Sequence, residues 1–116
     1  MLNTYRHDGS PNPAPNFPEM LRYSHGIWIP KLQSIFLQLA VAIRMENLAQ
    51  LCSMTSRIRK CAVMGGAHDI VNAMNQIDSY ARYGRWLAVR GEFRDARYML
   101  SELTQQVAVE LKRAAS

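Results

Sequence analysis

Apolar residues recur at intervals of three and four along most of the chain, which is the spacing of an α-helix with one buried face. The first run begins near Pro30. Its apolar positions are Leu32, Ile35, Phe36, Leu39 and Ile43. A polar break at Glu46 and Asn47 precedes the second run. That run consists of Leu48, Leu51, Cys52, Thr55, Ile58 and Ala62. The second helix should end near Gly65 and Gly66, because glycine favours a helix C-cap and a tight turn.

Two further runs follow the glycine pair. The third consists of Ala67, Ile70, Val71, Met74, Ile77 and Ala81. It stops at Gly84, and we expect a short connector containing Trp86 and Gly91 before a last helix, roughly Glu92 to Ala114. The last run consists of Phe93, Ala96, Leu100, Leu103, Val107 and Leu111. No segment shows the alternation typical of a half-buried strand. The pattern therefore predicts an all-α fold, an antiparallel four-helix bundle.

The N-terminal part has a different composition. Residues 1–16 contain Pro11, Pro13 and Pro15 among small polar residues, so we predict an irregular arm there. Phe17 to Tyr23 favour a short extra helix with a proline in its first turn. We therefore expect an arm over residues 1–16 and one helical-bundle domain over residues 17–116, a length sufficient for a core of its own.

Composition and charge limit the location and the partners. The longest uncharged apolar stretch, Leu32 to Ile43, is too short to cross a bilayer. Met1 to Ser10 lack the apolar core of a signal peptide, so we expect a cytoplasmic protein without membrane contact. The formal net charge is +5, and arginine supplies most of the positive side. Such a charge permits nucleic acid, an anionic membrane or an acidic protein surface as partner.

No set of catalytic residues emerges from the sequence. His7, His25 and His68 are scattered, and no pair of them has the spacing of metal ligands. His68 should face solvent in the first turn of the third helix, and Asp78 should be a solvated residue on a flank of the same helix. We therefore expect no enzyme, no metal and no other cofactor.

The segment from Ser56 to Ala67, SRIRKCAVMGGA, resembles the signature of histidine phosphotransfer (HPt) domains of two-component relays, which is roughly H-x-L-K-G-x-x-x-x-x-G-A. Ile58 stands at the aliphatic position and Arg59 at the basic one. The segment from Ile77 to Trp86 is similar to the family's L-E-x-x-A-R-x-G-D-W connector. The resemblance runs from residue 30 onward and implies an HPt-like bundle.

Two departures from the family pattern change what the resemblance implies. Ser56 occupies the position of the phosphorylatable histidine, and a serine hydroxyl does not form the labile phosphoramidate of a relay. Lys60 replaces a glycine that lets the acidic pocket of a receiver domain approach. On a helical wheel Ser56, Lys60, Ser53 and Ala49 share one flank, with Arg57 just beyond. The resemblance therefore implies a degenerate module that docks without relaying phosphate.

The predicted function is a non-catalytic pseudo-HPt module that docks a response-regulator receiver domain or a sensor kinase and modulates two-component signalling. The predicted partner-docking residues are Ser53, Ser56, Arg57, Arg59 and Lys60. Lys60 should project toward the carboxylates of the receiver. The alternative is that these residues are ordinary solvated charges at a helix end. Basic residues are common there because they complement the helix dipole.

Two other classes of function stay open. The first is a helical adaptor, such as a regulator of a secretion system, that only converges on this shape; an exposed apolar patch without binding of a receiver domain would favour it. The second is nucleic-acid binding through arginines near the last connector. These are Arg82, Arg85, Arg90, Arg94 and Arg97. Glu92 and Asp95 lower the net positive charge of that cluster, and no helix-turn-helix spacing accompanies it, so nucleic-acid binding ranks third. The sequence leaves the oligomeric state open.

Overall fold

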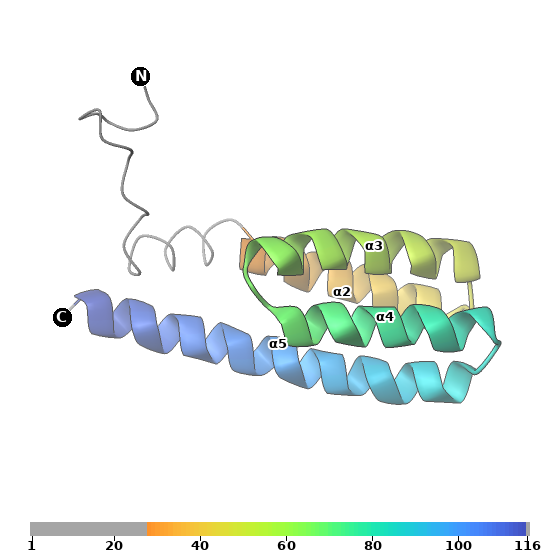
Figure 1. Ribbon diagram of the computed structural model, residues 1–116. Coiled ribbons are helices and arrows are strands. Elements are labelled where there is room, and N and C mark those ends of the chain that lie inside the picture. Colours follow the sequence, from red (N-terminus) through yellow and green to blue (C-terminus); the bar gives the residue numbers. More distant parts are fainter. Residues whose placement is uncertain (1–27, 116) are drawn as a thin grey trace, which may run out of the picture.

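The computed structural model describes residues 28–115, and they form four helices (Figure 1). These are α2 (Ile29–Arg44), α3 (Leu48–Met64), α4 (His68–Arg82) and α5 (Trp86–Ala115). This part of the chain contains no strand. The predicted arm over residues 1–16 and the predicted helix from Phe17 to Tyr23 lie outside the described residues. Among the described helices, none has both the length and the apolar character that crossing a bilayer requires.

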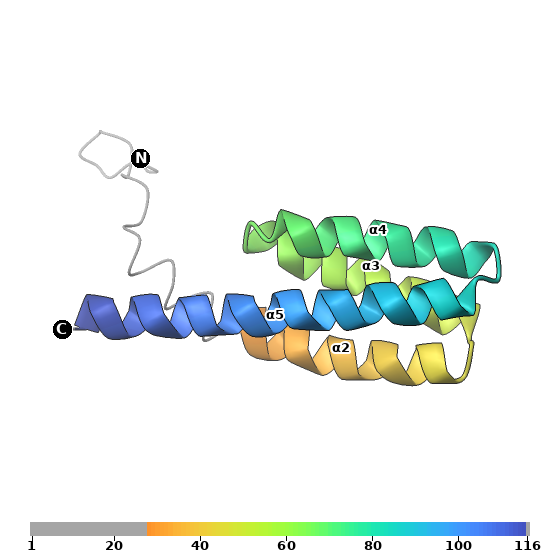
Figure 2. The ribbon, with the colours of Figure 1, turned by 90° about the horizontal axis from the view of Figure 1, so that it is seen from below.

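Successive helices run in opposite directions and pack side by side (Figures 1 and 2). α3 packs on α2, α4 packs on α3, and α5 packs on both α4 and α2. The 30 residues of α5 make it the longest helix, and its C-terminal part extends beyond the ends of the other three (Figure 2). The prediction of an all-helical bundle is confirmed for the described residues.

The turns between the helices follow from a few residues. The side chain of Asn47 caps α3 by accepting a hydrogen bond of 3.0 Å from the backbone N–H of Gln50. Gly66 and Gly84 have φ angles of 73° and 72°, a backbone conformation that strains residues with a side chain. The predicted break at Asn47 and the predicted ends near Gly66 and Gly84 therefore agree with the structure.

α5 begins earlier than the sequence pattern predicts. Only residues 83–85 separate α4 from α5, so the predicted connector containing Trp86 and Gly91 is wrong, because both residues lie within the helix. A glycine inside a helix costs only about 1 kcal/mol relative to alanine. Val89 and Phe93, which flank Gly91 along the helix, are buried, and burial of such side chains more than offsets that cost.

The core lies where the four helices face one another and is largely aliphatic. Its fully buried large side chains are Ile29, Leu32, Ile35, Leu39, Leu51, Ile58, Ile70, Met74, Ile77 and Val89. Between α2 and α5 the rings of Phe36 and Phe93 stack with centroids 5.9 Å apart. Leu48 departs from the predicted stripe, because its side chain is exposed at the start of α3.

Trp28 closes one end of the bundle against Gly65. The indole is buried and lies directly on the backbone of Gly65, where a Cβ atom would overlap the ring. Gly65 has an ordinary φ of −91°, so the close approach of Trp28, and not the backbone conformation, requires glycine at this position.

We expect Gly65→Ala to lower the free energy of unfolding by about 1–3 kcal/mol, because the added methyl group overlaps the Trp28 indole and forces the core to shift. Gly91→Ala is the matched control, since its added methyl group meets no neighbouring atom within 4 Å. It should raise the free energy of unfolding by about 0.5–1 kcal/mol through helix propensity. Urea unfolding followed by circular dichroism measures both variants. Equal stabilities of the two variants would contradict this account of the Trp28 contact.

Candidate functional site

The five predicted docking residues all lie on α3, but they do not share one face of it. Ser53, Arg57 and Lys60 are exposed on the outer side of the helix, and Ser56 is half-buried beside them. We call these four residues the α3 flank. Arg59 lies on a different side of α3, where its guanidinium meets α4.

The carboxylate of Asp78 on α4 holds Arg59 in that position. One oxygen of Asp78 lies 2.8 Å from a guanidinium nitrogen of Arg59, and the other accepts a hydrogen bond of 2.5 Å from the hydroxyl of Thr55. Thr55 is fully buried, and the Asp78 side chain is only 14% exposed. The prediction that Asp78 is a solvated surface residue is therefore wrong. Asp78 is the acceptor of a polar cluster between α3 and α4.

The α3 flank carries positive charge that its own helix does not balance. α3 contains no acidic residue. Lys60 forms no ion pair within the described part of the chain, and the nearest partner of Arg57 is the sulfur of Met54, 3.9 Å from a guanidinium nitrogen. Such a surface attracts carboxylates or phosphates, and its attraction weakens as salt is added.

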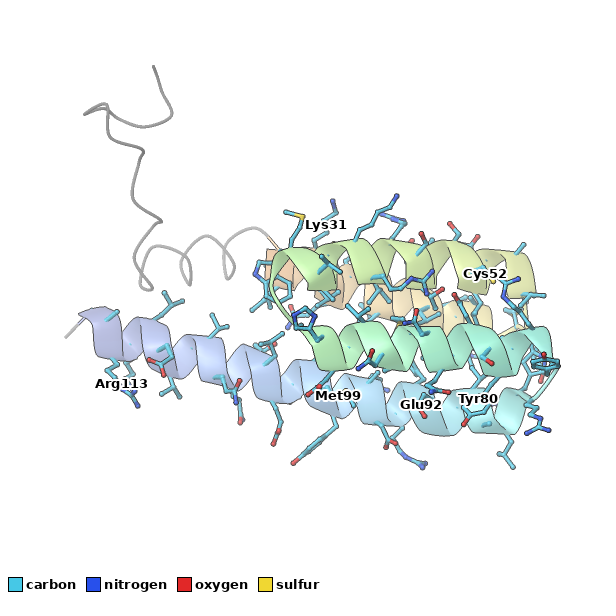
Figure 3. The ribbon with its side chains drawn as sticks, viewed as in Figure 1. Lys31, Cys52, Tyr80, Glu92, Met99 and Arg113 are labelled. Atoms are coloured by element: carbon cyan, nitrogen blue, oxygen red, sulfur yellow. The ribbon has the colours of Figure 1, made fainter. Side chains whose placement is uncertain are left out.

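Lys31 of α2 adds to this surface and is absent from the predicted set. α2 and α3 are antiparallel neighbours, so a residue near the start of α2 lies level with the end of α3. In the view of Figure 3, Lys31 appears level with the C-terminal part of α3. Lys31 and Lys60 lie at nearly equal distances in sequence from the turn between α2 and α3, and this is the signal that would have identified Lys31.

Two of the arginines near the start of α5, Arg90 and Arg97, contact other side chains. Arg90 lies 3.3 Å from a carboxylate oxygen of Glu46, and the guanidinium of Arg97 lies 5.9 Å from the centroid of the Phe93 ring. Farther along α5, Tyr98 lies one turn before Glu102. A hydrogen bond to Glu102 and the charge of that carboxylate raise the pKa of Tyr98.

His68 is exposed, as predicted, at the start of α4. It lines an open groove of about 350 Å³ between α4 and α5 together with Asp69 and Glu102. Within residues 28–115, no group of three or more histidine, cysteine, aspartate or glutamate side chains is placed to hold a metal ion. Because of the two carboxylates, this groove carries negative charge, whereas the α3 flank carries positive charge.

Comparisons of the chain with protein-family models, with curated proteins and with solved structures find no match. Its function is therefore inferred from its own residues and their geometry.

Asp78→Ala should lower the free energy of unfolding by about 1–3 kcal/mol, because Thr55 and Arg59 lose their shared acceptor while both stay at the helix interface. Glu46→Gln is the control, because it breaks the exposed pair with Arg90 and should change stability by only about 0.5 kcal/mol or less. Thermal unfolding measures both. If Asp78→Ala costs no more than Glu46→Gln, the cluster does not stabilise the packing of α3 on α4.

Proposed function

We propose that this chain is a non-catalytic, HPt-like signalling module. It docks a response-regulator receiver domain, or a sensor kinase, through the α3 flank and modulates two-component signalling without carrying phosphate. The observation that carries the proposal is the exposed pair of cations, Arg57 and Lys60, beside Ser56 on a helix without acidic residues.

Charge complementarity supports a receiver domain as the partner. The acceptor pocket of a receiver domain is acidic, and Lys60 stands where the HPt family has a glycine that admits this pocket. The lysine ammonium is a compact charge on a flexible stem, so it can reach carboxylates that a short side chain cannot. Complementary charge mainly raises the rate of association and selects the partner.

The position of Ser56 supports binding without relay. A relay histidine accepts phosphate on a ring nitrogen, and the resulting N–P bond is labile enough for onward transfer. The serine hydroxyl offers oxygen only, and a phosphate ester on it does not return its phosphoryl group to an aspartate. A protein of this kind acts by occupancy, so its effect depends on its concentration relative to its partner.

A helical adaptor unrelated to phosphorelay is the alternative, and one observation favours it. Leu37 and Val41 of α2 and Met45, which caps its end, are 72%, 54% and 71% exposed, although large apolar side chains are usually buried. They follow one another at intervals of four residues, so they form an apolar stripe on the outer side of α2. An adaptor uses such a stripe to bind a partner, and the α3 flank would then be an ordinary charged surface.

Lys60→Glu should weaken binding to the cognate receiver domain by about tenfold or more, because a carboxylate then faces an acidic pocket. Arg94→Glu makes the same change of charge on the exposed surface of α5 and should leave the affinity within about twofold. Titration calorimetry against the receiver domains of the same genome measures both variants. If no receiver domain binds, or if the two variants weaken binding equally, the proposal fails and the adaptor is favoured.

The double variant Ser56→His, Lys60→Gly should accept a phosphoryl group from the phosphorylated receiver domain, whereas the natural chain should not. In this step the P–O bond to the receiver aspartate breaks, an N–P bond forms on His, and the aspartate leaves as a carboxylate. Radiolabelled transfer followed on gels measures it, with Ser56→Ala, Lys60→Gly as the control. Transfer to the natural chain would contradict the assignment of a non-relay role.

A further inference from the structure

The outer side of α2 is unusually apolar for an exposed surface. α2 has 16 residues, and only Lys31 and Arg44 among them are charged. Leu37, Val41 and Met45 lie on this side at intervals of four residues, and all three are exposed. A helix that is apolar on its outer as well as its inner side is usually covered by another element.

A groove adjoins this stripe. It lies between α2 and α5, has a volume of about 410 Å³, and is lined by Phe36, Leu37 and Leu100 as its large apolar side chains. Leu37 belongs both to the groove and to the stripe. The groove and the stripe therefore adjoin at Leu37, and we call them together the α2 face: Leu37, Val41 and Met45 are its exposed side chains, and the largely buried Phe36 and Leu100 form the floor of the groove.

Cations border the α2 face. Arg97 lines the groove, Arg44 lies beside the end of the stripe, and Lys31 lies on the other flank of α2, six residues before Leu37. None of the three forms an ion pair within the described residues, and no carboxylate is among the described residues that line the groove. Glu46, which follows Arg44 by two residues, is held by Arg90.

We propose that the α2 face is a docking site for an amphipathic helix of another protein, whose apolar stripe is bordered by aspartate or glutamate. The stripe from Leu37 to Met45 spans about 12 Å, or two helical turns, and is only one residue wide. That shape fits the apolar side of one helix, with the carboxylates of the helix facing Arg44, Lys31 and Arg97. This docking site is separate from the α3 flank, and the proposal does not depend on whether a receiver domain binds the α3 flank.

Charge disfavours the other occupants of an apolar face. A second copy of this chain would place the α2 cations near those of its partner, because the face carries no carboxylate to meet them. An anionic membrane attracts cations, but stable binding needs a broad apolar surface with aromatic residues at the interface. The α2 stripe is narrow and aliphatic.

The test uses a synthetic helical peptide of 16 residues, the length of α2, with leucines along one stripe and glutamates on both flanks. A second peptide replaces every glutamate with lysine. We expect the acidic peptide to bind the full chain with a Kd of about 100 μM or tighter and the lysine peptide to bind about tenfold or more weakly. Fluorescence anisotropy measures both peptides.

Val41→Asp should weaken binding of the acidic peptide by about tenfold or more. Val63→Asp is the matched control, because Val63 is 57% exposed on α3 and Val41 is 54% exposed on α2. It should leave the affinity within about twofold, and the circular dichroism of both variants should match that of the natural chain.

Four outcomes would overturn the proposal. Three concern the peptides: the acidic and the lysine peptide bind equally, the acidic peptide does not bind, or Val63→Asp weakens its binding as much as Val41→Asp does. The fourth is another occupant of the α2 face. In that case the chain forms a dimer in sedimentation or binds phosphatidylglycerol vesicles, the acidic peptide does not bind, and Val41→Asp abolishes the dimer or the vesicle binding.

Discussion

The carboxylate of Asp78 lies between α3 and α4, where Thr55 donates a hydrogen bond to it and Arg59 pairs with it. A charge this sheltered from water is tolerated only while its partners remain in place. Rotation of α3 about its axis, or sliding of α3 along α4, would separate these groups. Together with the buried apolar side chains of α3, the cluster therefore sets which side of α3 faces solvent, and Arg57 and Lys60 lie on that exposed side.

The end of α3 is held by a second contact of a different kind. The Trp28 indole lies on the backbone of Gly65, so the residue that precedes α2 packs against the residue that ends α3. α3 is therefore anchored by charge near its middle and by close packing at its end. A surface on such an element keeps its geometry when a partner approaches, which reduces the entropy lost on binding.

The sequence predicts local features of this molecule well and interhelical features poorly. The spacing of apolar residues locates all four described helices, because each stripe depends only on positions within its own helix. The start of α5 is missed because burial of Phe93 compensates for Gly91. The roles of Asp78 and Arg59 are missed because each finds its partner on another helix. Val41 and Leu37 belong to an uncharged run typical of a core, and only the packing of α2 shows which of its residues stay exposed.

The α3 flank and the α2 face lie on neighbouring helices. Both surfaces are bordered by cations, so both of the proposed dockings call for an acidic partner. Charges about 8–10 Å apart still influence each other at physiological salt. A separate acidic partner bound at one surface would therefore reduce the attraction of the other, and coupling of that kind is reciprocal. Two independent partners would compete without touching, whereas one partner that spans both surfaces would gain from each. On electrostatic grounds, the two dockings proposed on this bundle would therefore be coupled.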